Sequence, residues 1–73
     1  MIGVSITSLA EKNRLEAFKH YVSAWKKQNA DTVTYVDGIF SYKTRHGIIK
    51  SFVSSSKPTN LKVNGFYFAE INN

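Results

Sequence analysis

The feature that most constrains the fold of this chain is a series of three short turn signals that follows one long amphipathic segment. The signals are Asp37-Gly38, His46-Gly47 and Asn64-Gly65. Asp-Gly and Asn-Gly favour type I′ turns, because these residues tolerate the positive φ angles that both central positions of such a turn require. His-Gly is a weaker signal. The order therefore predicts one helix followed by a series of β-hairpins.

The amphipathic segment predicts a single helix over about residues 8–29. Ser8 and Glu11 have the spacing of a capping box, in which the Ser8 hydroxyl accepts from the Glu11 amide and the Glu11 carboxylate reaches back to the Ser8 amide. Apolar residues then recur at spacings of three and four and form one stripe to be buried against the sheet: Leu15, Phe18, Tyr21, Val22 and Trp25. Basic residues favour the negative end of the helix dipole, so the helix is expected to end near Gln28 or Asn29.

The segments on either side of the helix have the period of strands. Residues 1–7 alternate apolar with small or polar side chains, which predicts an N-terminal strand. After the helix, a two-residue turn at Asp37-Gly38 sets Tyr35 opposite Phe40. This register gathers the large side chains on one face, as a sheet with one buried face requires. These side chains are Val33, Tyr35, Phe40 and Tyr42.

The middle turn allows two interpretations. We first treat the His-Gly step as a two-residue turn as well, which adds Ile49 and Val53 to the apolar face. The same register sets Lys43 directly opposite Lys50, and like charges opposed in this way are mildly destabilising. Either the turn is therefore longer than two residues, or an anion bound at this place offsets the repulsion.

The C-terminal part of the chain predicts one loop and one more hairpin. Residues 54–60 contain three successive serines and a proline, which is typical of an extended loop. Residues 61–63 and 66–71 flank Asn64-Gly65 and predict a last hairpin, whose register the pattern leaves open. The whole chain, residues 1–73, is therefore predicted to be one α+β domain, with an N-terminal strand and a helix packed on an antiparallel meander of about four or five short strands.

Length and cysteine content limit the classes of protein that fit this chain. The absence of cysteine excludes disulfide bonds and cysteine-ligated zinc, and it indicates a reducing compartment such as the cytoplasm. The apolar runs are far too short to cross a bilayer, so no contact with a membrane is expected. No metal or other cofactor is expected either, because two histidines lack cysteine partners. A domain of 73 residues has a small core, and a homodimer is one arrangement that would add burial.

Charge gives the first indication of function. Ten basic residues against five acidic ones give a net charge of +5, which favours an anionic partner. One group of lysines has a seven-residue spacing and forms a continuous ridge on a helix: Lys12, Lys19 and Lys26. The ordinary interpretation of this ridge is a solvated helix face, in which Glu16 pairs with the neighbouring basic residues.

A second basic group surrounds the middle turn. It consists of Lys43, Arg45, His46 and Lys50. Tyr67 and Phe52 are candidates for stacking surfaces, and basic groups with aromatic side chains are the components of single-stranded nucleic-acid platforms. The ordinary interpretation is that the aromatic residues favour strands and fill the core.

These observations lead to two binding functions. The sequence contains no RNP motif, GXXG clamp, helix-turn-helix or zinc finger. We expect a non-enzymatic binding module that contacts an anionic partner, with nucleic acid first among the candidates. The alternative is a protein-directed inhibitor or adaptor that binds an acidic surface of a larger protein. It would use residue types that dominate binding hot spots, here Trp25, Tyr21, Arg45 and Tyr67.

The third hypothesis is an enzyme. His46 has the chemistry of an acid or base for phosphodiester cleavage, and Arg45 or Lys43 would stabilise the developing charge. The predicted order of strand, helix and meander on a basic chain resembles, in topology alone, small ribonuclease toxins of the RelE type. A helix followed by short strands is also similar, at the level of the fold, to Sm-like RNA-binding rings.

Overall fold

The computed structural model describes residues 8–71, so the predicted N-terminal strand over residues 1–7 lies outside the described residues. The described chain begins with helix α1, Leu9–His20, which continues as one π-helical turn, η1, Tyr21–Trp25. A short 3-10 turn, η2, Ala30–Thr32, leads into the strands. The strands are β1 (Thr34–Val36), β2 (Ile39–Lys43), β3 (Ile49–Ser55), β4 (Leu61–Val63) and β5 (Phe66–Glu70).

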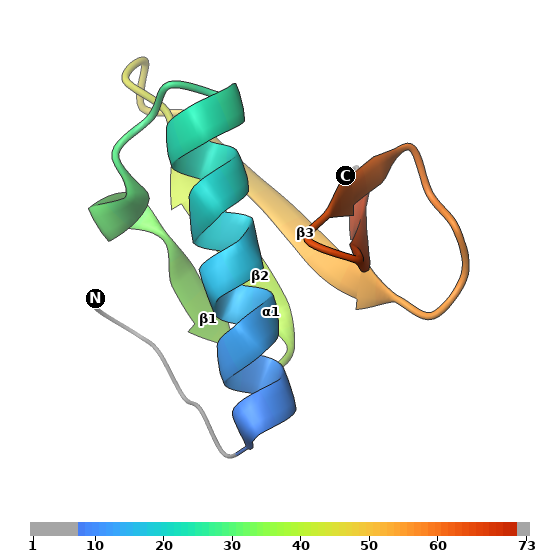
Figure 1. Ribbon diagram of the computed structural model, residues 1–73. Coiled ribbons are helices and arrows are strands. Elements are labelled where there is room, and N and C mark those ends of the chain that lie inside the picture. The colour runs from blue at the N-terminus through green and yellow to red at the C-terminus, as the bar shows by residue number, and fades with distance from the viewer. Residues whose placement is uncertain (1–7, 72–73) are drawn as a thin grey trace.

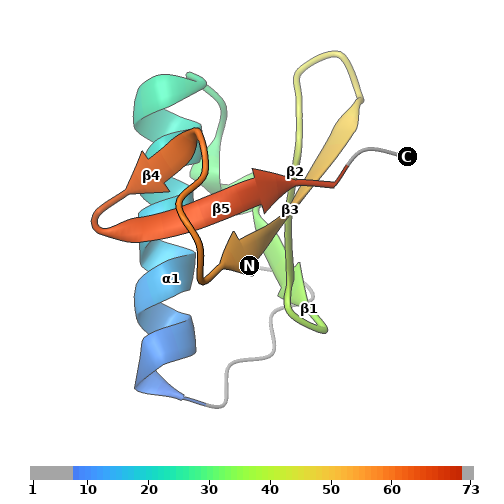
Figure 2. The same ribbon diagram turned by 90° about the vertical axis from the view of Figure 1, so that its right-hand side faces the viewer.

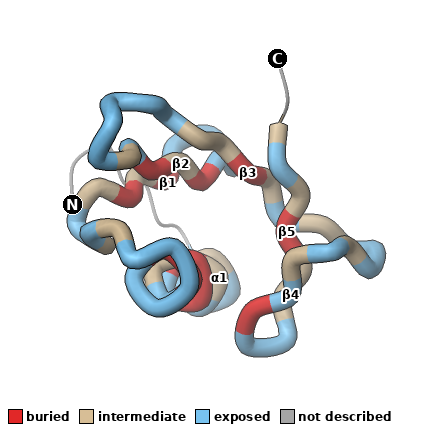
Figure 3. Tube along the Cα trace, turned by 90° about the horizontal axis from the view of Figure 1, so that it is seen from above, coloured by how far each residue is buried: buried red, intermediate tan, exposed pale blue. Residues whose placement is uncertain are grey.

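The helix packs on one face of a five-stranded antiparallel sheet, whose strand order is β1-β2-β3-β5-β4. Figure 1 shows α1 lying across β1 and β2, with the β4–β5 hairpin to one side, and Figure 2 shows the same layers from that side. From above, the strands form an arc around the helix, and buried residues occur in every strand (Figure 3). The predicted α+β class is confirmed.

Phe18 of α1 occupies the centre of the core. Its side chain is completely buried. Its ring centroid lies 5.2 Å from that of Phe52 and 5.5 Å from that of Phe68, spacings at which aromatic pairs add stability beyond that of burial alone. The apolar stripe of the helix is buried as predicted at Leu15, Phe18, Tyr21 and Val22.

Two aromatic side chains differ from the sequence prediction. Phe52, considered as a stacking surface, is only 4% exposed and packs against Phe18. Trp25, predicted to lie in the buried stripe, is 66% exposed. The π-helical turn explains this exposure, because the Lys26 amide donates to the Tyr21 carbonyl at 3.2 Å, five residues back instead of four. The stripe with a period of 3.6 residues therefore does not continue to Trp25.

The helical segment ends at Trp25, short of the predicted boundary near Gln28 or Asn29. Lys27 has a φ angle of 56°, in the left-handed region, and the Gln28 amide donates to the Val22 carbonyl at 3.0 Å. A left-handed residue just after the last turn is a common way to end a helix, and it is usually glycine. A lysine at this position ends the helix without a recognisable sequence signal.

At the start of the helix, the Glu11 amide donates to the Ser8 hydroxyl at 3.1 Å, which is the first of the two bonds of the predicted capping box. The Glu11 carboxylate accepts from the Ser8 hydroxyl at 3.3 Å and from the hydroxyl of Tyr35 at 2.9 Å. The bond with Tyr35 connects the first turn of α1 to β1, at the end of the helix opposite to Lys27.

Two of the three turns have the predicted geometry. The central residues of the β1–β2 and β4–β5 turns all have positive φ angles, as a type I′ turn requires: Asp37, Gly38, Asn64 and Gly65. Tyr35 lies opposite Phe40, as predicted, and Val63 lies opposite Phe66, which fixes the register of the last hairpin. The predicted loop over residues 54–60 is shorter, because β3 continues to Ser55.

The middle turn is longer than two residues, so the register that assumes a two-residue turn is wrong by one position. The Thr44 amide donates to the Ile48 carbonyl at 2.8 Å, and the Gly47 amide donates to the Thr44 carbonyl at 2.9 Å. With a φ angle of 83° at Gly47, these bonds define a three-residue loop made of a type I turn and a bulge. Lys43 now lies opposite Ile49, and the two lysines are no longer opposed.

The one-residue shift reverses the faces of β3. Ile49 and Val53, predicted on the inner apolar face, lie on the outer face, and Phe52 takes their place in the core. Lys50 lies opposite Tyr42 and forms an ion pair with Glu70 at 3.7 Å. The longer of the two turns considered is therefore the one that forms. It separates Lys43 from Lys50, so the predicted repulsion between them does not require a bound anion.

Candidate nucleic-acid interface

The end of the helical segment and the β2–β3 turn lie at the same end of the molecule, uppermost in Figures 1 and 2. We call this region the basic end. It comprises Trp25, Lys26, Lys27, Lys43, Arg45 and His46, all of which are exposed. Lys26 and Lys27 follow η1, whereas Lys43 is the last residue of β2. Arg45 and His46 lie in the β2–β3 turn. The fold thus brings together basic residues from two distant parts of the chain.

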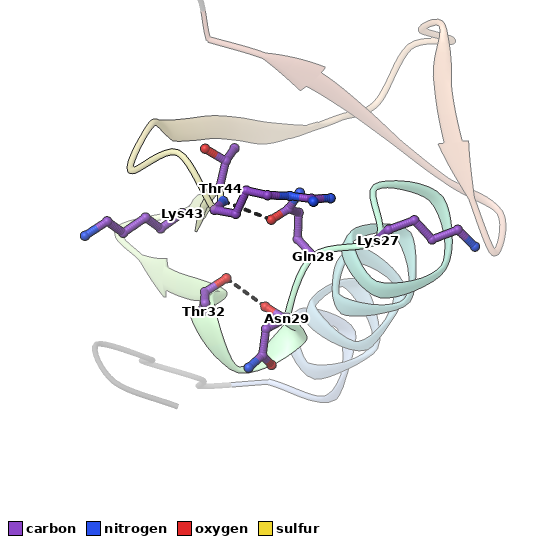
Figure 4. Close-up of a pocket in the computed structure, with 7 residues that line it drawn as sticks. Lys27, Gln28, Asn29, Thr32, Lys43 and Thr44 are labelled. Carbon is purple, nitrogen blue, oxygen red and sulfur yellow. Dashed lines mark hydrogen bonds between the residues drawn. The ribbon is translucent and has the colours of Figure 1, made fainter.

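One hydrogen bond joins the two halves of the basic end directly. The Arg45 amide donates to the side-chain oxygen Oε1 of Gln28 at 3.1 Å. The segment that follows the helix is itself ordered by a bond from the Thr32 hydroxyl to the Asn29 carbonyl at 2.7 Å. Both bonds are drawn in Figure 4, where the Arg45–Gln28 bond joins the β2–β3 turn to the segment after the helix and the Thr32–Asn29 bond is internal to that segment.

An open hollow of about 330 Å³ lies between these two segments. Its lining consists of Lys27, Gln28, Asn29, Thr32, Lys43, Thr44 and Arg45. Figure 4 shows Lys27 and Lys43 on opposite sides of the hollow, with their side chains extending away from one another. The two amines therefore do not converge on one point, and they lie on opposite sides of the hollow.

The cations of the basic end have no acidic partner among residues 8–71. The ion pairs of these residues are Lys19 with Glu16, at 3.9 Å, and Lys50 with Glu70, at 3.7 Å. Lys26 instead lies over the ring of Tyr21, with Nζ 5.8 Å from the ring centroid. A cation over an aromatic face keeps its full charge. The basic end therefore presents positive charge that no neighbouring carboxylate neutralises.

The acidic residues lie largely elsewhere. Glu11 is in the first turn of α1, and Asp37 is in the β1–β2 turn, which lies at the lower end of the molecule in Figure 1. Asp31, in η2, is the acidic residue closest in sequence to the basic end. Four of the ten Lys and Arg residues, and none of the five acidic residues, belong to the basic end.

Two phenols lie below the basic end, where the helix meets the sheet. Burial raises the pKa of Tyr42, and the neighbouring Tyr21 and Glu70 raise it further, whereas Lys26 lowers it. Burial, followed by the charge of Glu70, also raises the pKa of Tyr21. Both phenols are therefore protonated and neutral near pH 7, and they serve here as core residues with a polar edge.

The other predicted site residues lie apart from the basic end. Tyr67 pairs with Ser55, at the far end of β3 from Ile49, and six residues of strand correspond to about 20 Å. Nζ of Lys62 lies 5.5 Å from the centroid of the Tyr67 ring. Lys12 and Lys19 lie along α1, and Lys50 lies on the inner side of β3. Lys19 and Lys50 are in ion pairs, with Glu16 and Glu70 respectively.

Two residues of the basic end are not predicted from the sequence to belong to a basic surface. The sequence places Trp25 in the buried stripe, and otherwise names it only as a hot-spot residue type for a protein partner. Its exposure depends on a π-helical turn that the 3.6-residue pattern does not reveal. Lys27 is not among the candidate site residues predicted from the sequence, whereas in the structure it flanks the hollow opposite Lys43. An apolar residue followed directly by two lysines at the end of a helix is the one signal that the sequence offers for this surface.

Several general findings complete the description of the site. Within residues 8–71, no helix is long and apolar enough to cross a membrane, and no group of three or more histidine or acidic side chains is arranged to hold a metal ion. The outer face of the sheet exposes apolar side chains such as Val36, Ile39 and Ile49, which are available for contact with a second copy of the chain. The expected homodimer stays a prediction.

Comparisons with protein families, with curated proteins and with solved structures found no match for this chain.

Proposed function

We propose that this chain is a non-enzymatic binding module that contacts nucleic acid through its basic end. The observation that carries the proposal is that three cations from two segments line one open hollow and have no acidic partner among residues 8–71: Lys27, Lys43 and Arg45. Phosphate contacts from lysine and arginine supply most of the affinity of non-specific nucleic-acid binding. A net charge of +5 on 73 residues adds long-range attraction for such a ligand.

The geometry favours an extended polyanion over a single small anion. A site for one phosphate group needs donors that converge on it, as in helix N-termini and backbone nests. Lys27 and Lys43 diverge on either side of an open hollow, so each amine would reach a different phosphate. A nucleic-acid strand, with its regular series of phosphates, matches this arrangement.

A second candidate is the acidic surface of a larger protein, which the chain would bind as an inhibitor or adaptor. Its support is the exposure of apolar residues beside the cations, because Trp25 and Ile49 are each 66% exposed. Tryptophan and arginine are enriched in binding hot spots. Nucleic acid ranks first because most residues of the basic end are cations, and only Trp25 among them is apolar.

The proposal is tested by fluorescence anisotropy of labelled DNA and RNA, in single-stranded and duplex form, across a salt series. Two double variants are compared: Lys43→Gln with Arg45→Gln at the basic end, and Lys12→Gln with Lys57→Gln elsewhere. Each lowers the net charge from +5 to +3 by removing two basic side chains, so the pair is matched in charge. We expect the first to reduce the salt slope on a single strand by about 1.4, at about 0.7 per lost phosphate contact, and the second to change it much less.

Three results would count against the proposal. Equal effects of the two double variants would show that net charge alone attracts nucleic acid. Binding no tighter than about 10⁻⁴ M at physiological salt would favour a protein partner. Cleavage of the RNA probe on a denaturing gel, abolished by His46→Ala, would instead establish the ribonuclease hypothesis.

A further inference from the structure

We infer that Trp25 is a stacking platform for an unpaired base, so that the basic end prefers single-stranded over duplex nucleic acid. The inference rests on the proposed function and extends it to a class of ligand. The Trp25 side chain is 66% exposed at the last position of η1, although the other members of its helical stripe are buried. Its exposure is set by the π-helical hydrogen bond between Lys26 and Tyr21.

The position of Trp25 among the cations supports the inference. Lys26 and Lys27 follow it directly in the chain. The side chain of Gln28 accepts from the Arg45 amide. Gln28 is three residues after Trp25, so their Cα atoms lie at most about 11 Å apart. An indole and cations from both segments therefore lie within reach of a few consecutive nucleotides. Proteins that bind single strands without sequence preference combine a basic surface with aromatic rings in this way.

The requirement of an accessible base distinguishes single strands from duplexes. In a duplex the bases are already stacked, and a side chain reaches their faces only by prying a base step apart. Phosphates would contact the lysine and arginine side chains of the two segments, which leaves the exposed indole of Trp25 for a base. The face of an unpaired base is accessible to the indole without the cost of unstacking a base step.

The chain contains one tryptophan, which makes the test specific. Intrinsic fluorescence of the full chain is titrated with a short single-stranded oligonucleotide and with the duplex of the same sequence. A base stacked on the indole quenches its emission, so we expect strong quenching by the single strand and weak quenching by the duplex. Trp25→Phe keeps an aromatic face and Trp25→Ala removes it, and both are compared with the original chain by anisotropy.

We expect Trp25→Ala to weaken single-strand binding about 5- to 150-fold, the effect of losing one stacked base, and Trp25→Phe to weaken it less. Duplex affinity and the salt slope should stay the same, because the phosphate contacts remain. Circular dichroism confirms that both variants fold, which is expected for so exposed a side chain. If Trp25→Ala left single-strand affinity unchanged, or weakened single strands and duplexes equally, the inference would be overturned while the proposed function would stand.

A different result would overturn both proposals. If neither the single strand nor the duplex bound the original chain, the basic end would not be a nucleic-acid surface at all. Trp25 would then be better explained as an anchor for a protein partner. The test therefore distinguishes failure of the inference from failure of the function on which it rests.

Discussion

Replacing Lys27 by glycine is expected to stabilise the domain while weakening its contact with nucleic acid. Lys27 has a φ angle of 56°, and a side chain with a Cβ atom costs about 1–2 kcal/mol in the left-handed region. Glycine removes that cost but loses about 0.5–1 kcal/mol through the greater freedom of the unfolded chain. The net gain therefore has a middle value of about 0.75 kcal/mol. For a domain of this size it corresponds to a rise in Tm of about 3–6 °C.

Lys27→Ala is the matched control, because it removes the same charge and keeps the Cβ atom. The two variants should lose nucleic-acid affinity equally, with the salt slope on a single strand lowered by about 0.7 in each. Urea denaturation should show Lys27→Gly to be the more stable of the two by about 1 kcal/mol. Equal stability, or a less stable glycine variant, would refute the argument that the backbone of Lys27 is strained. Such a strained lysine is consistent with selection for binding over stability.

Three further predictions concern the fold. Gly47→Ala should lower the free energy of unfolding in urea by about 1 kcal/mol, because φ is 83° and no atom of residues 8–71 lies within 4 Å of an added Cβ. An unchanged free energy of unfolding would contradict this backbone effect. Phe18→Ala should lower the free energy of unfolding by about 3–5 kcal/mol, because the ring is completely buried among aromatic side chains. Circular dichroism should then show substantial unfolding at 37 °C, and a cooperative Tm near that of the original chain would contradict the central position of Phe18 in the core. Burial raises the pKa of Tyr21 and of Tyr42 above 10.0, so the folded state holds these protons more tightly than the unfolded state. The free energy of unfolding should therefore be constant from neutral pH to about pH 9 and fall above pH 10. An increase in the urea midpoint as the pH is raised above 10 would contradict this sign.

The sequence predicted best those parts of the fold that local chemistry determines. Asp37-Gly38 and Asn64-Gly65 fix their turns because few other residues adopt the two positive φ angles of a type I′ turn. His46-Gly47 is compatible with turns of two or three residues. The choice depends on contacts outside the turn signal, among them the bond from the Ile48 amide to the Thr44 hydroxyl at 3.2 Å and the burial of Phe52.

The candidate site was predicted only in part, for a related reason. Positive charge around the middle turn is visible in the sequence, and it led to Lys43, Arg45 and His46. The joining of this turn to the end of the helix depends on the three-dimensional bond between Gln28 and Arg45. The exposure of Trp25 and the left-handed backbone after it arise from how the helix ends, which periodicity does not encode.

The most direct test of the central claim is an NMR titration of the isotope-labelled chain with a short single-stranded oligonucleotide at physiological salt. If the basic end binds nucleic acid, the largest changes in amide chemical shift should fall in two separate segments, residues 25–29 and residues 43–48, and should saturate together. Changes concentrated on the outer face of the sheet, on the N-terminal half of α1, or absent altogether would contradict the account.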